Sequence, residues 1–296
     1  MSFEDFVGNG VAIARLKGIL KQGRPAHAYL FAGPEGVGKK KAALAFAEAL
    51  GAPVTLIERP EEKHEILIAQ IRELIRQLSF ASAEPRAILV NDAHLMSEEA
   101  MNSFLKTLEE PPARTLILLI SHVPDRLLGT IRSRCQTVHF APLPDDDIAA
   151  YARTKLGLSD ENGRALAALA EGSLGAALLG ASGIEEIKTA ARDLQTRALS
   201  GELNPLIEAL GRIRDTEEAR KRAKRDMRLL ALSLREALRA RSGAPLALAT
   251  PEFVEKLKRL DEDALTDRLQ TLLDHERMID LNANVGLTVE DALLRM

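Results

Sequence analysis

The residues with the clearest potential for chemistry lie in one stretch, residues 33–40, with the sequence GPEGVGKK. Its Gly-x-x-x-x-Gly-Lys spacing is typical of a loop that binds phosphate groups. The residues expected to form the phosphate site are Gly33, Gly36, Gly38, Lys39 and Lys40. Glycines allow positive φ angles, so successive backbone N–H groups can point at an anion. The N-terminus of a following helix would add partial positive charge, and Lys39 would reach a terminal phosphate.

One position of this loop departs from the pattern of a working ATPase. A serine or threonine normally follows the lysine, because its hydroxyl binds the Mg²⁺ ion that bridges the β- and γ-phosphates. Here that position holds Lys40, whose ammonium repels a cation. The alternative for the stretch is a glycine-rich turn without a ligand. Because the loop N–H groups and Lys39 remain, the sequence leaves open whether nucleotide or phosphate binds.

A second part of an ATPase site is expected after the apolar residues 87–90. The first acidic residue there normally holds Mg²⁺ through water, and a second carboxylate orients the attacking water. The first position holds the neutral Asn91, and the second holds Asp92, which is shorter than the usual Glu. Since Lys40 and Asn91 each remove a ligand of the same ion, we expect little or no ATP hydrolysis. The alternative for Asn91 and Asp92 is a polar strand end that caps a turn.

The flanking residues supply the elements that must position these side chains. Residues 28–32 (AYLFA) predict a buried strand before the loop, and residues 41–50, rich in Ala and Leu, predict a helix after it. Helical periodicity recurs at 68–78 and 97–108. Further strands are expected at 54–57, 87–90, 116–120 and 136–140. Strands that alternate with helices indicate a parallel α/β sheet covered on both faces.

The sequence changes character after residue 141, where no further strand is expected. Residues 142–147 (PLPDDD) indicate a linker that ends in a helix cap. We predict a P-loop α/β domain at residues 1–145, a small helical domain at 146–183 and an all-α domain at 184–296.

A basic stretch at residues 212–241 holds eleven Lys or Arg residues against five acidic ones. One interpretation is an approach to DNA. The favoured alternative is a solvated helix face with i, i+4 ion pairs, such as Glu218 with Arg222.

Composition narrows the classes of protein. The length of 296 residues allows two or three domains with a sizeable core. A net charge of −3 gives no global reason to bind nucleic acid, and the absence of Trp argues against base stacking as a major mode. The single cysteine, Cys135, excludes a disulfide framework and a cysteine-based zinc site, and the six histidines show no close ligand spacing. We therefore predict no metal site.

No signal peptide and no apolar stretch long enough to span a bilayer is found in the sequence. We therefore expect a cytoplasmic protein with no membrane partner.

Four segments in order along the chain resemble the AAA+ clamp-loader subunits of bacterial DNA polymerase III, most closely the delta-prime branch of that family. They are residues 24–31 (RPAHAYLF), 70–74 (QIREL), 102–112 (NSFLKTLEEPP) and 124–135 (PDRLLGTIRSRC). The last two are highly specific together, whereas a lone phosphate loop occurs in many families. The resemblance is strong from about residue 3 to 145 and weaker beyond. It implies an AAA+ domain, then a helical lid, then a helical collar that serves oligomerisation.

The resemblance implies a role for Arg134 in the Ser-Arg-Cys motif. In this family that arginine lies at a subunit boundary and reaches the γ-phosphate of ATP bound by the neighbour. A guanidinium suits the task, because it stays charged and its planar donors match phosphate oxygens. Ser133 and Cys135 would frame Arg134 without taking part in the chemistry. Outside this context, Arg134 would be interpreted as a surface arginine paired with a carboxylate.

The family pattern adds a third departure to Lys40 and Asn91. Members that hydrolyse ATP commonly have an arginine where Gly175 stands, and it senses the γ-phosphate from the lid. Some relatives also carry a four-cysteine zinc module after the phosphate-loop helix. Residues 51–60 contain no cysteine, so no such module is predicted.

The resemblance therefore implies a non-hydrolysing stator of the clamp loader, an open ring of five AAA+ subunits. It would supply Arg134 to a neighbouring ATPase subunit while the assembly loads the sliding clamp on primed DNA. Expected partners are the gamma or tau ATPase subunits, the delta subunit, the clamp and, through the complex, DNA. No cofactor of its own is required, because the ATP belongs to the neighbour. Two alternatives stay open: an active AAA+ motor that tolerates Lys40 and Asn91, and a free nucleotide-sensing regulator that joins no ring.

Overall fold

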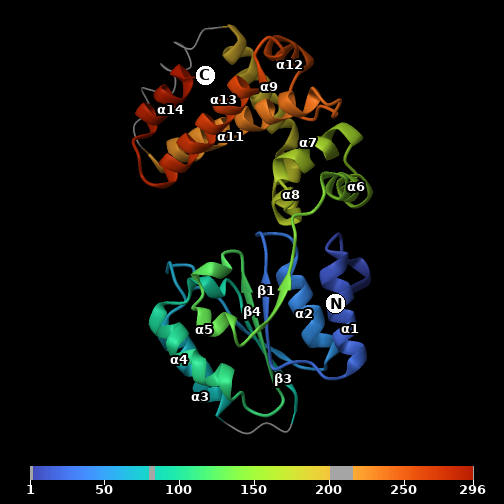
Figure 1. Ribbon diagram of the computed structural model, residues 1–296, viewed down its shortest axis with the longest axis vertical. Helices are drawn as coiled ribbons and strands as arrows, with labels where there is room; N and C mark the ends of the chain where they lie inside the picture. The colour runs from blue at the N-terminus through green and yellow to red at the C-terminus, as the bar shows by residue number, and fades with distance from the viewer. Residues whose placement is uncertain (1–2, 80–83, 201–215, 296) are drawn as a thin grey trace. The chain divides into compact units, whose positions relative to one another are not determined.

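The computed structural model describes residues 3–79, 84–200 and 216–295. The chain divides into two compact units (Figure 1). The first unit comprises Met1–Asp147 and Glu171–Ala176, and the second comprises Ile148–Ala170 and Ala177–Met296. The finer division into a lid at 146–183 and a collar at 184–296 stays a prediction.

The first unit contains a five-stranded sheet and the helices that connect its strands. The strands are β1 (Ala28–Ala32), β2 (Val54–Ile57), β3 (Arg86–Val90), β4 (Thr115–Ser121) and β5 (Gln136–His139). The helices are α1 (Gly10–Gln22), α2 (Lys39–Ala49), α3 (Ile68–Leu78), α4 (Glu98–Glu109) and α5 (Gly129–Arg132), with 3-10 turns η1 (Phe3–Asp5), η2 (Ala93–Leu95) and η3 (Pro124–Arg126). The predicted strands agree with the observed ones to within one residue at each end, and the α/β class is confirmed.

All neighbouring strands in this sheet are parallel, in the order β2-β3-β4-β1-β5. Leu30 at the centre of β1 pairs with Leu119 of β4 on one side and with Thr137 of β5 on the other. Because the strands are parallel, the loops that follow β1, β3 and β4 all emerge at one edge of the sheet, here called the carboxyl edge. The loops that precede the strands emerge at the opposite amino edge.

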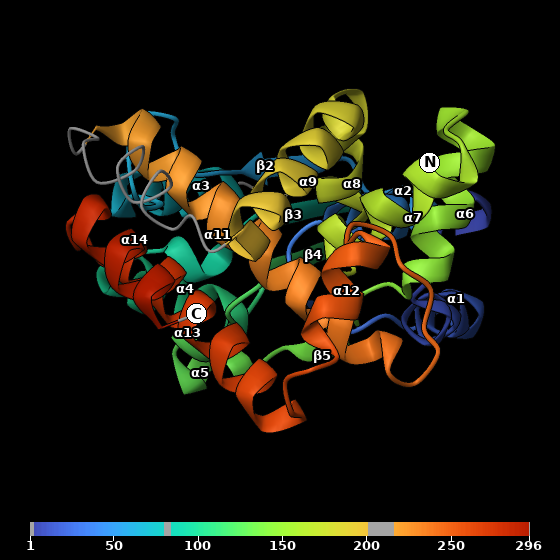
Figure 2. The same cartoon turned by 90° about the horizontal axis from the view of Figure 1, so that it is seen from above.

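Helices cover both faces of the sheet. Leu30 and Leu119 belong to a buried cluster with Phe104 of α4 and with apolar side chains of α3. On the opposite face the ring of Tyr29 meets that of Phe46 in α2 edge-on, with centroids 5.2 Å apart. In Figures 1 and 2, α1 and α2 accordingly lie on one side of the sheet and α3 and α4 on the other. Since β4 is buried along its whole length, it is a continuous apolar run rather than an alternating one.

The second unit is helical throughout its described residues. The helices that follow β5 are α6 (Asp145–Leu156), α7 (Asp160–Ala170), α8 (Leu174–Gly180), α9 (Ile184–Ser200), α11 (Glu217–Ala240), α12 (Pro251–Leu257), α13 (Glu262–Asp280) and α14 (Val285–Leu294), with the turn η4 (Ala181–Gly183). The long helix α11 forms the core of this unit, and α9, α12, α13 and α14 pack against it. No helix in the described parts of the chain has the length and apolarity needed to cross a membrane.

A buried carboxylate fixes the chain between α11 and α12. Glu236 Oε2 accepts hydrogen bonds from the backbone N–H groups of Ala247, Leu248 and Ala249, at 3.0, 2.9 and 2.9 Å. Gln195 of α9 continues this network, since its Oε1 accepts from the Thr250 N–H at 2.8 Å. Two buried N–H groups and one partly buried one therefore depend on one side chain for their hydrogen bonds.

We predict that Glu236→Ala lowers the free energy of unfolding by about 3 kcal/mol, because three backbone donors, two of them buried, lose their acceptor. Urea unfolding followed by circular dichroism measures this change. The matched control is Glu255→Ala, because the Glu255 side chain is 72% exposed and pairs with the exposed Lys258. Its removal is expected to cost less than about 1 kcal/mol. Equal effects of the two substitutions would contradict the assigned role of Glu236.

Candidate functional site

The loop at residues 33–40 connects β1 to α2, which is the strand–loop–helix context that the sequence predicted. Gly33, Gly36 and Gly38 have φ angles of 146°, 72° and 98°. The first two are also required by packing. A Cβ atom on Gly33 would lie 2.1 Å from the Phe140 carbonyl oxygen, and one on Gly36 would lie 2.0 Å from Ser173 Oγ. The glycines therefore allow the loop to fit against two other segments of the first unit.

Lys39 is turned back onto its own loop. Its Nζ donates to the carbonyl oxygens of Gly33 and Pro34, at 2.6 and 2.5 Å. Burial lowers the pKa of the Lys39 ammonium, and the negative charges of Asp92 and Glu35 oppose that shift. The ammonium is thus retained at the carboxyl edge by loop carbonyls and nearby carboxylates.

The two residues that replace magnesium ligands are joined through Glu58, which directly follows β2. Lys40 Nζ lies 2.8 Å from Glu58 Oε1, and Asn91 Nδ2 donates to the same oxygen at 3.2 Å. Asn91 Nδ2 also lies 3.1 Å from Asp92 Oδ2. The Lys40 ammonium therefore places a positive charge next to the Glu58 carboxylate. Glu58 escaped the sequence analysis, although its place at the end of a predicted strand already put it at this edge.

Gly175, the third departure noted in the sequence, lies against the phosphate loop. The Gly175 N–H donates to the Gly36 carbonyl oxygen at 2.9 Å. A Cβ atom on Gly175 would lie 3.0 Å from Gly36 Cα. The close approach of two backbones thus explains why this position has no side chain.

These groups do not fit Mg²⁺-ATP. Mg²⁺ requires octahedral oxygen ligands, and phosphate-loop enzymes supply a hydroxyl and a carboxylate. The corresponding positions hold the Lys40 ammonium and the Asn91 amide, and both are engaged with Glu58. Asp92 is the carboxylate that remains, and it has a left-handed backbone with φ 50°. We therefore derive no hydrolysis step at this site.

Two histidines that the sequence left without a role lie together at the same edge. His94 belongs to η2 after β3, and His122 directly follows β4. Their ring centroids are 4.1 Å apart at an interplanar angle of 72°. Asp92 Oδ1 lies 3.4 Å from His122 Nδ1, and Ser121 Oγ lies 3.2 Å from His94 Nδ1. The spacing along the sequence concealed this group, because adjacent strands bring the residues together.

The His94 imidazole is neutral at neutral pH. Burial lowers its pKa to about 4, and positive charge on His122, Arg126 and Lys39 adds to the shift, while Asp92 opposes it. The ring therefore keeps a free lone pair under physiological conditions.

Arg134 lies at the other edge of the sheet. It follows α5 and precedes the amino end of β5, whereas residues 33–40 follow the carboxyl end of β1. Its guanidinium lies 2.5 Å from Glu109 Oε1 and donates to the Thr130 carbonyl oxygen at 2.9 Å. This pair joins the two specific motifs, since Glu109 belongs to the Leu-Glu-Glu-Pro-Pro segment. The alternative of a surface arginine paired with a carboxylate thus describes the isolated chain.

The neighbours of Arg134 have structural roles. Ser133 Oγ donates to the Thr130 carbonyl oxygen at 3.1 Å. Burial raises the pKa of the Cys135 thiol to about 12, so it is not a nucleophile at neutral pH. That Ser133 and Cys135 only frame Arg134 stays a prediction.

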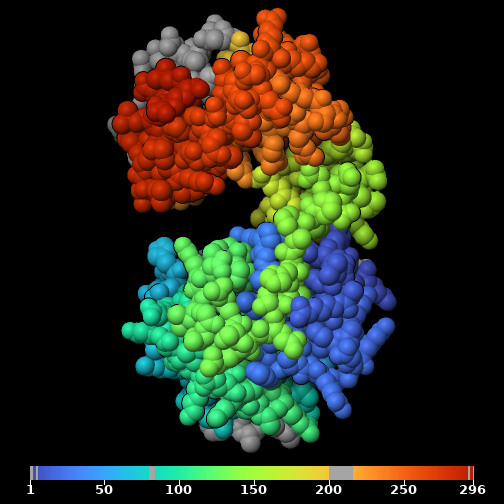
Figure 3. Space-filling model, viewed as in Figure 1, coloured from blue at the N-terminus to red at the C-terminus, as the bar shows by residue number. Residues whose placement is uncertain are grey.

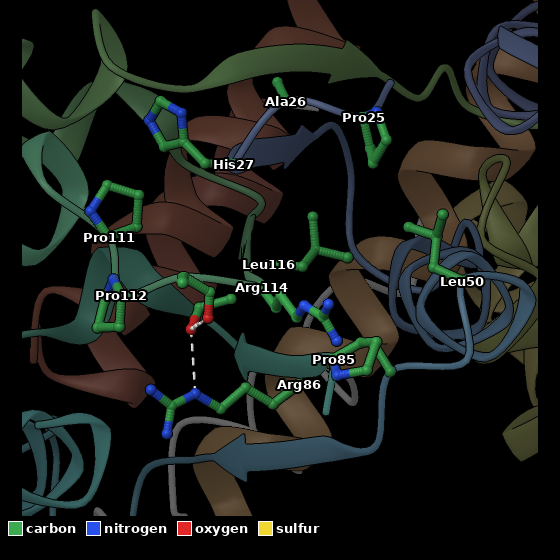
Figure 4. A pocket seen from close by; sticks show the side chains of 13 residues that line it. Pro25, Ala26, His27, Leu50, Pro85, Arg86, Pro111, Pro112, Arg114 and Leu116 are labelled. Atoms are coloured by element: carbon green, nitrogen blue, oxygen red, sulfur yellow. Dashed lines mark hydrogen bonds between the residues drawn. The ribbon is translucent and has the colours of Figure 1, made fainter. Parts of the chain in front are cut away.

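A pocket of about 470 Å³ also opens at the amino edge (Figure 4). Pro111 and Pro112, from the same motif as Glu109, form part of its wall. Arg86 Nε donates to Thr115 Oγ1 at 3.0 Å, which orders the polar side of the pocket. The pocket and the phosphate loop are therefore at opposite ends of the strands.

The basic stretch of the second unit is largely engaged in ion pairs. Arg212 and Arg214 lie outside the described residues. Lys224 pairs with Asp280 at 2.5 Å, and Arg228 pairs with Glu276 at 3.1 Å, which joins α11 to α13. Further pairs within α11 are Lys221–Glu217 and Arg222–Asp226. These contacts favour the structural interpretation over a DNA-binding face.

Comparison with known proteins decides the family. Residues 8–55 and 51–144 match the family model described as DNA polymerase III, delta subunit. The delta' subunit of Escherichia coli K12 is 30% identical over 248 residues, which cover 80% of this chain and 72% of the relative. The chain belongs to the DNA polymerase III delta' family. The Pseudomonas aeruginosa delta' subunit is 36% identical over 145 residues, covering 40% of this chain and 44% of the relative.

The match to other clamp-loader subunits is partial. The tau subunit of Bacillus subtilis is 32% identical over 161 residues, which cover 47% of this chain but only 29% of the relative. The chain thus spans less than a third of that relative. Among solved structures, a single-residue variant of RuvB from Thermotoga maritima has a TM-score of 0.51 at 15% identity, covering 90% of this chain and 86% of the other. This likeness shows the AAA+ fold with its helical continuation, and the delta' family membership rests on sequence.

We predict that stability falls on acidification because of His94. The unfolded chain binds a proton at this residue near pH 6.5, whereas the folded chain binds it only near pH 4. Between these values the unfolded state binds more protons, so folding stability is lost as the pH decreases. The loss from pH 7 to pH 5 is expected to be on the order of 2 kcal/mol.

Urea unfolding at the two pH values, on the natural chain and on His94→Gln, measures this contribution. The variant is expected to lose less stability than the natural chain on acidification. His139→Gln, at an exposed histidine of β5, serves as the control. If the natural chain and His94→Gln show the same pH dependence, His94 does not titrate as described.

Proposed function

We propose that this delta' family member is a non-hydrolysing stator of the clamp loader that supplies Arg134 to an ATPase site on a neighbouring subunit. The proposal rests on the separation of two features. The remnant of an ATPase site lies at the carboxyl edge of the sheet, while Arg134 lies at the amino edge. An arginine at the far edge is unable to act on a nucleotide in its own loop, so its ligand must come from another chain.

The condition of the chain's own loop supports the first half of the proposal. Lys40 pairs with Glu58, and Asn91 donates to the same carboxylate. The turn at residues 172–175 is hydrogen-bonded to Gly36. No cofactor of its own is therefore required. The nucleotide that matters is the ATP of the neighbour.

The surroundings of Arg134 support the second half. Its side chain is 34% exposed and that of Glu109 is 47% exposed. A pair this exposed contributes at most about 1 kcal/mol. A γ-phosphate offers more charge and more acceptor oxygens than one carboxylate. Arg134 can thus exchange Glu109 for a phosphate at small cost, and in the free chain Glu109 holds the guanidinium in a defined place.

The C-terminal helices support assembly with other subunits. Met278 and Leu281 at the end of α13 and Leu287 and Leu294 of α14 are between 45% and 82% exposed. Each pair has a spacing that places both side chains on one side of its helix. These helices form the red surface in Figure 3. We propose that these exposed apolar side chains contact a neighbouring subunit in the assembly.

The partners that we propose follow from the relatives. They are the gamma or tau ATPase subunits, the delta subunit, the sliding clamp and, through the complex, primed DNA. In this account the chain works in the cytoplasm as part of the polymerase holoenzyme and has no ATPase activity of its own.

We predict that Arg134→Ala leaves the chain folded but lowers ATP turnover of the assembled complex. An arginine finger contributes roughly 10³–10⁵ in rate at the site that it serves. ATP turnover of the complex should therefore fall by the part that this one site contributes. Steady-state turnover of the reconstituted complex, saturated with clamp and primed DNA, measures the loss.

Arg132→Ala is the matched control, because Arg132 is the last residue of α5, two positions before Arg134, and pairs with Asp125 at 2.6 Å. Its removal should leave turnover unchanged. Size-exclusion chromatography verifies that both variants assemble to the same extent. Unchanged turnover in an intact Arg134→Ala complex would refute the proposed role, and a chain that never assembles would support a free regulator instead.

A further inference from the structure

We propose that Asp92, His94 and His122 form a binding site for one divalent transition-metal ion of the Zn²⁺ class. One ligand atom from each residue lies within 4.8 Å of the others. The site uses neither a nucleotide nor a cysteine, so it differs from a magnesium–ATP site and from a four-cysteine zinc module. It is independent of the proposed role of Arg134, which lies at the other edge of the sheet.

An unsatisfied atom points to a missing partner at this place. His122 Nδ1 is buried and has no hydrogen-bond partner, although the His122 side chain as a whole is 32% exposed. Asp92 Oδ1 lies 3.4 Å away, near enough for charge attraction but too poorly directed for a hydrogen bond. A buried polar atom without a partner is unfavourable. A metal ion bound between Asp92 and His122 would satisfy this nitrogen.

His94 is prepared to act as a ligand. Its ring is buried and lies beside that of His122, with ring centroids 4.1 Å apart. Ser121 Oγ lies 3.2 Å from Nδ1 and also accepts from the Val123 N–H at 3.1 Å, which orients both groups. Such a second partner on a ring nitrogen is typical of histidine ligands, because it fixes the tautomer and the ring plane.

The geometry requires only a small contraction. Bonds of about 2.0–2.2 Å to zinc place tetrahedral ligand atoms roughly 3.3–3.5 Å apart. Asp92 and His122 have partly exposed side chains, at 36% and 32%, and can move toward the buried His94. The main-chain positions are set by β3 and β4, which are neighbours in the sheet. A fourth position would remain open to water.

The donor set and the surrounding charge favour a transition metal over Mg²⁺. Two imidazoles with one carboxylate suit Zn²⁺, Co²⁺ and Ni²⁺, whereas Mg²⁺ prefers oxygen ligands. Lys39 and Arg126 are positive charges close enough to act on His94. These positive charges repel any cation, and Mg²⁺ gains little from imidazole ligands to offset that repulsion. A metal that forms strong bonds to imidazole nitrogen, such as Zn²⁺, is therefore favoured.

Titration of the nucleotide-free full chain with Co²⁺, followed by visible absorption and by displacement with Zn²⁺, tests the proposal. We expect one Co²⁺ per chain with a tetrahedral spectrum. His122→Asn and Asp92→Asn are expected to weaken binding at least about tenfold, since loss of an outer-shell partner alone costs ten- to a hundredfold. Both residues are partly exposed, so thermal unfolding should show that the variants remain folded.

The matched control is His139→Asn, which removes an exposed histidine from β5. It should leave both stoichiometry and affinity unchanged. Absence of saturable binding, equal binding by His122→Asn and the natural chain, or an equal loss in His139→Asn would each overturn the site. The last outcome would identify adventitious binding to surface histidines.

Discussion

The parallel pairing of β3, β4 and β1 is the constraint on which the candidate sites depend. Parallel strands send their following loops to one edge, so residues distant in sequence meet there. The phosphate loop follows β1, Asn91 and Asp92 follow β3, and His122 follows β4. The same pairing sends Arg134 to the opposite edge. The fold thereby separates what remains of a nucleotide site from the residue proposed to serve another one.

At the carboxyl edge, charges of the chain's own lie at the positions where a phosphate-loop ATPase holds magnesium ligands. Where a magnesium ion would sit among oxygen ligands, Lys40 places an ammonium beside Glu58, and Asn91 donates to the same carboxylate. The Lys40 ammonium thus supplies the positive charge that Mg²⁺ would otherwise bring with a nucleotide. Gly175 then allows the turn at 172–175 to approach Gly36 closely. Lys40 and Asn91 thus meet at Glu58, and Gly175 contacts the loop that carries Lys40.

The strand bounds were predictable from the sequence, because they depend on residues close together along the chain. The strands at 28–32 and 54–57 have the observed bounds, because short apolar runs and the loop chemistry between them are local properties. The sequence analysis did not identify Glu109 as the carboxylate that pairs with Arg134, or Glu58 as the partner of Lys40, because each pair joins segments far apart in sequence. His94 and His122 are 28 positions apart and have no metal-ligand spacing, yet neighbouring strands bring their rings to 4.1 Å. Strand order, which the sequence did not predict, is the missing information in each case.

Equilibrium binding of ATP to the isolated chain, with and without Mg²⁺ and with a parallel turnover assay, tests the central claim most directly. The account predicts weak or absent binding that does not respond to Mg²⁺, together with no turnover, because Lys40 and Asn91 occupy the positions of the magnesium ligands. Tight binding that requires Mg²⁺ and is accompanied by turnover would contradict it, and the chain would then be an active motor subunit.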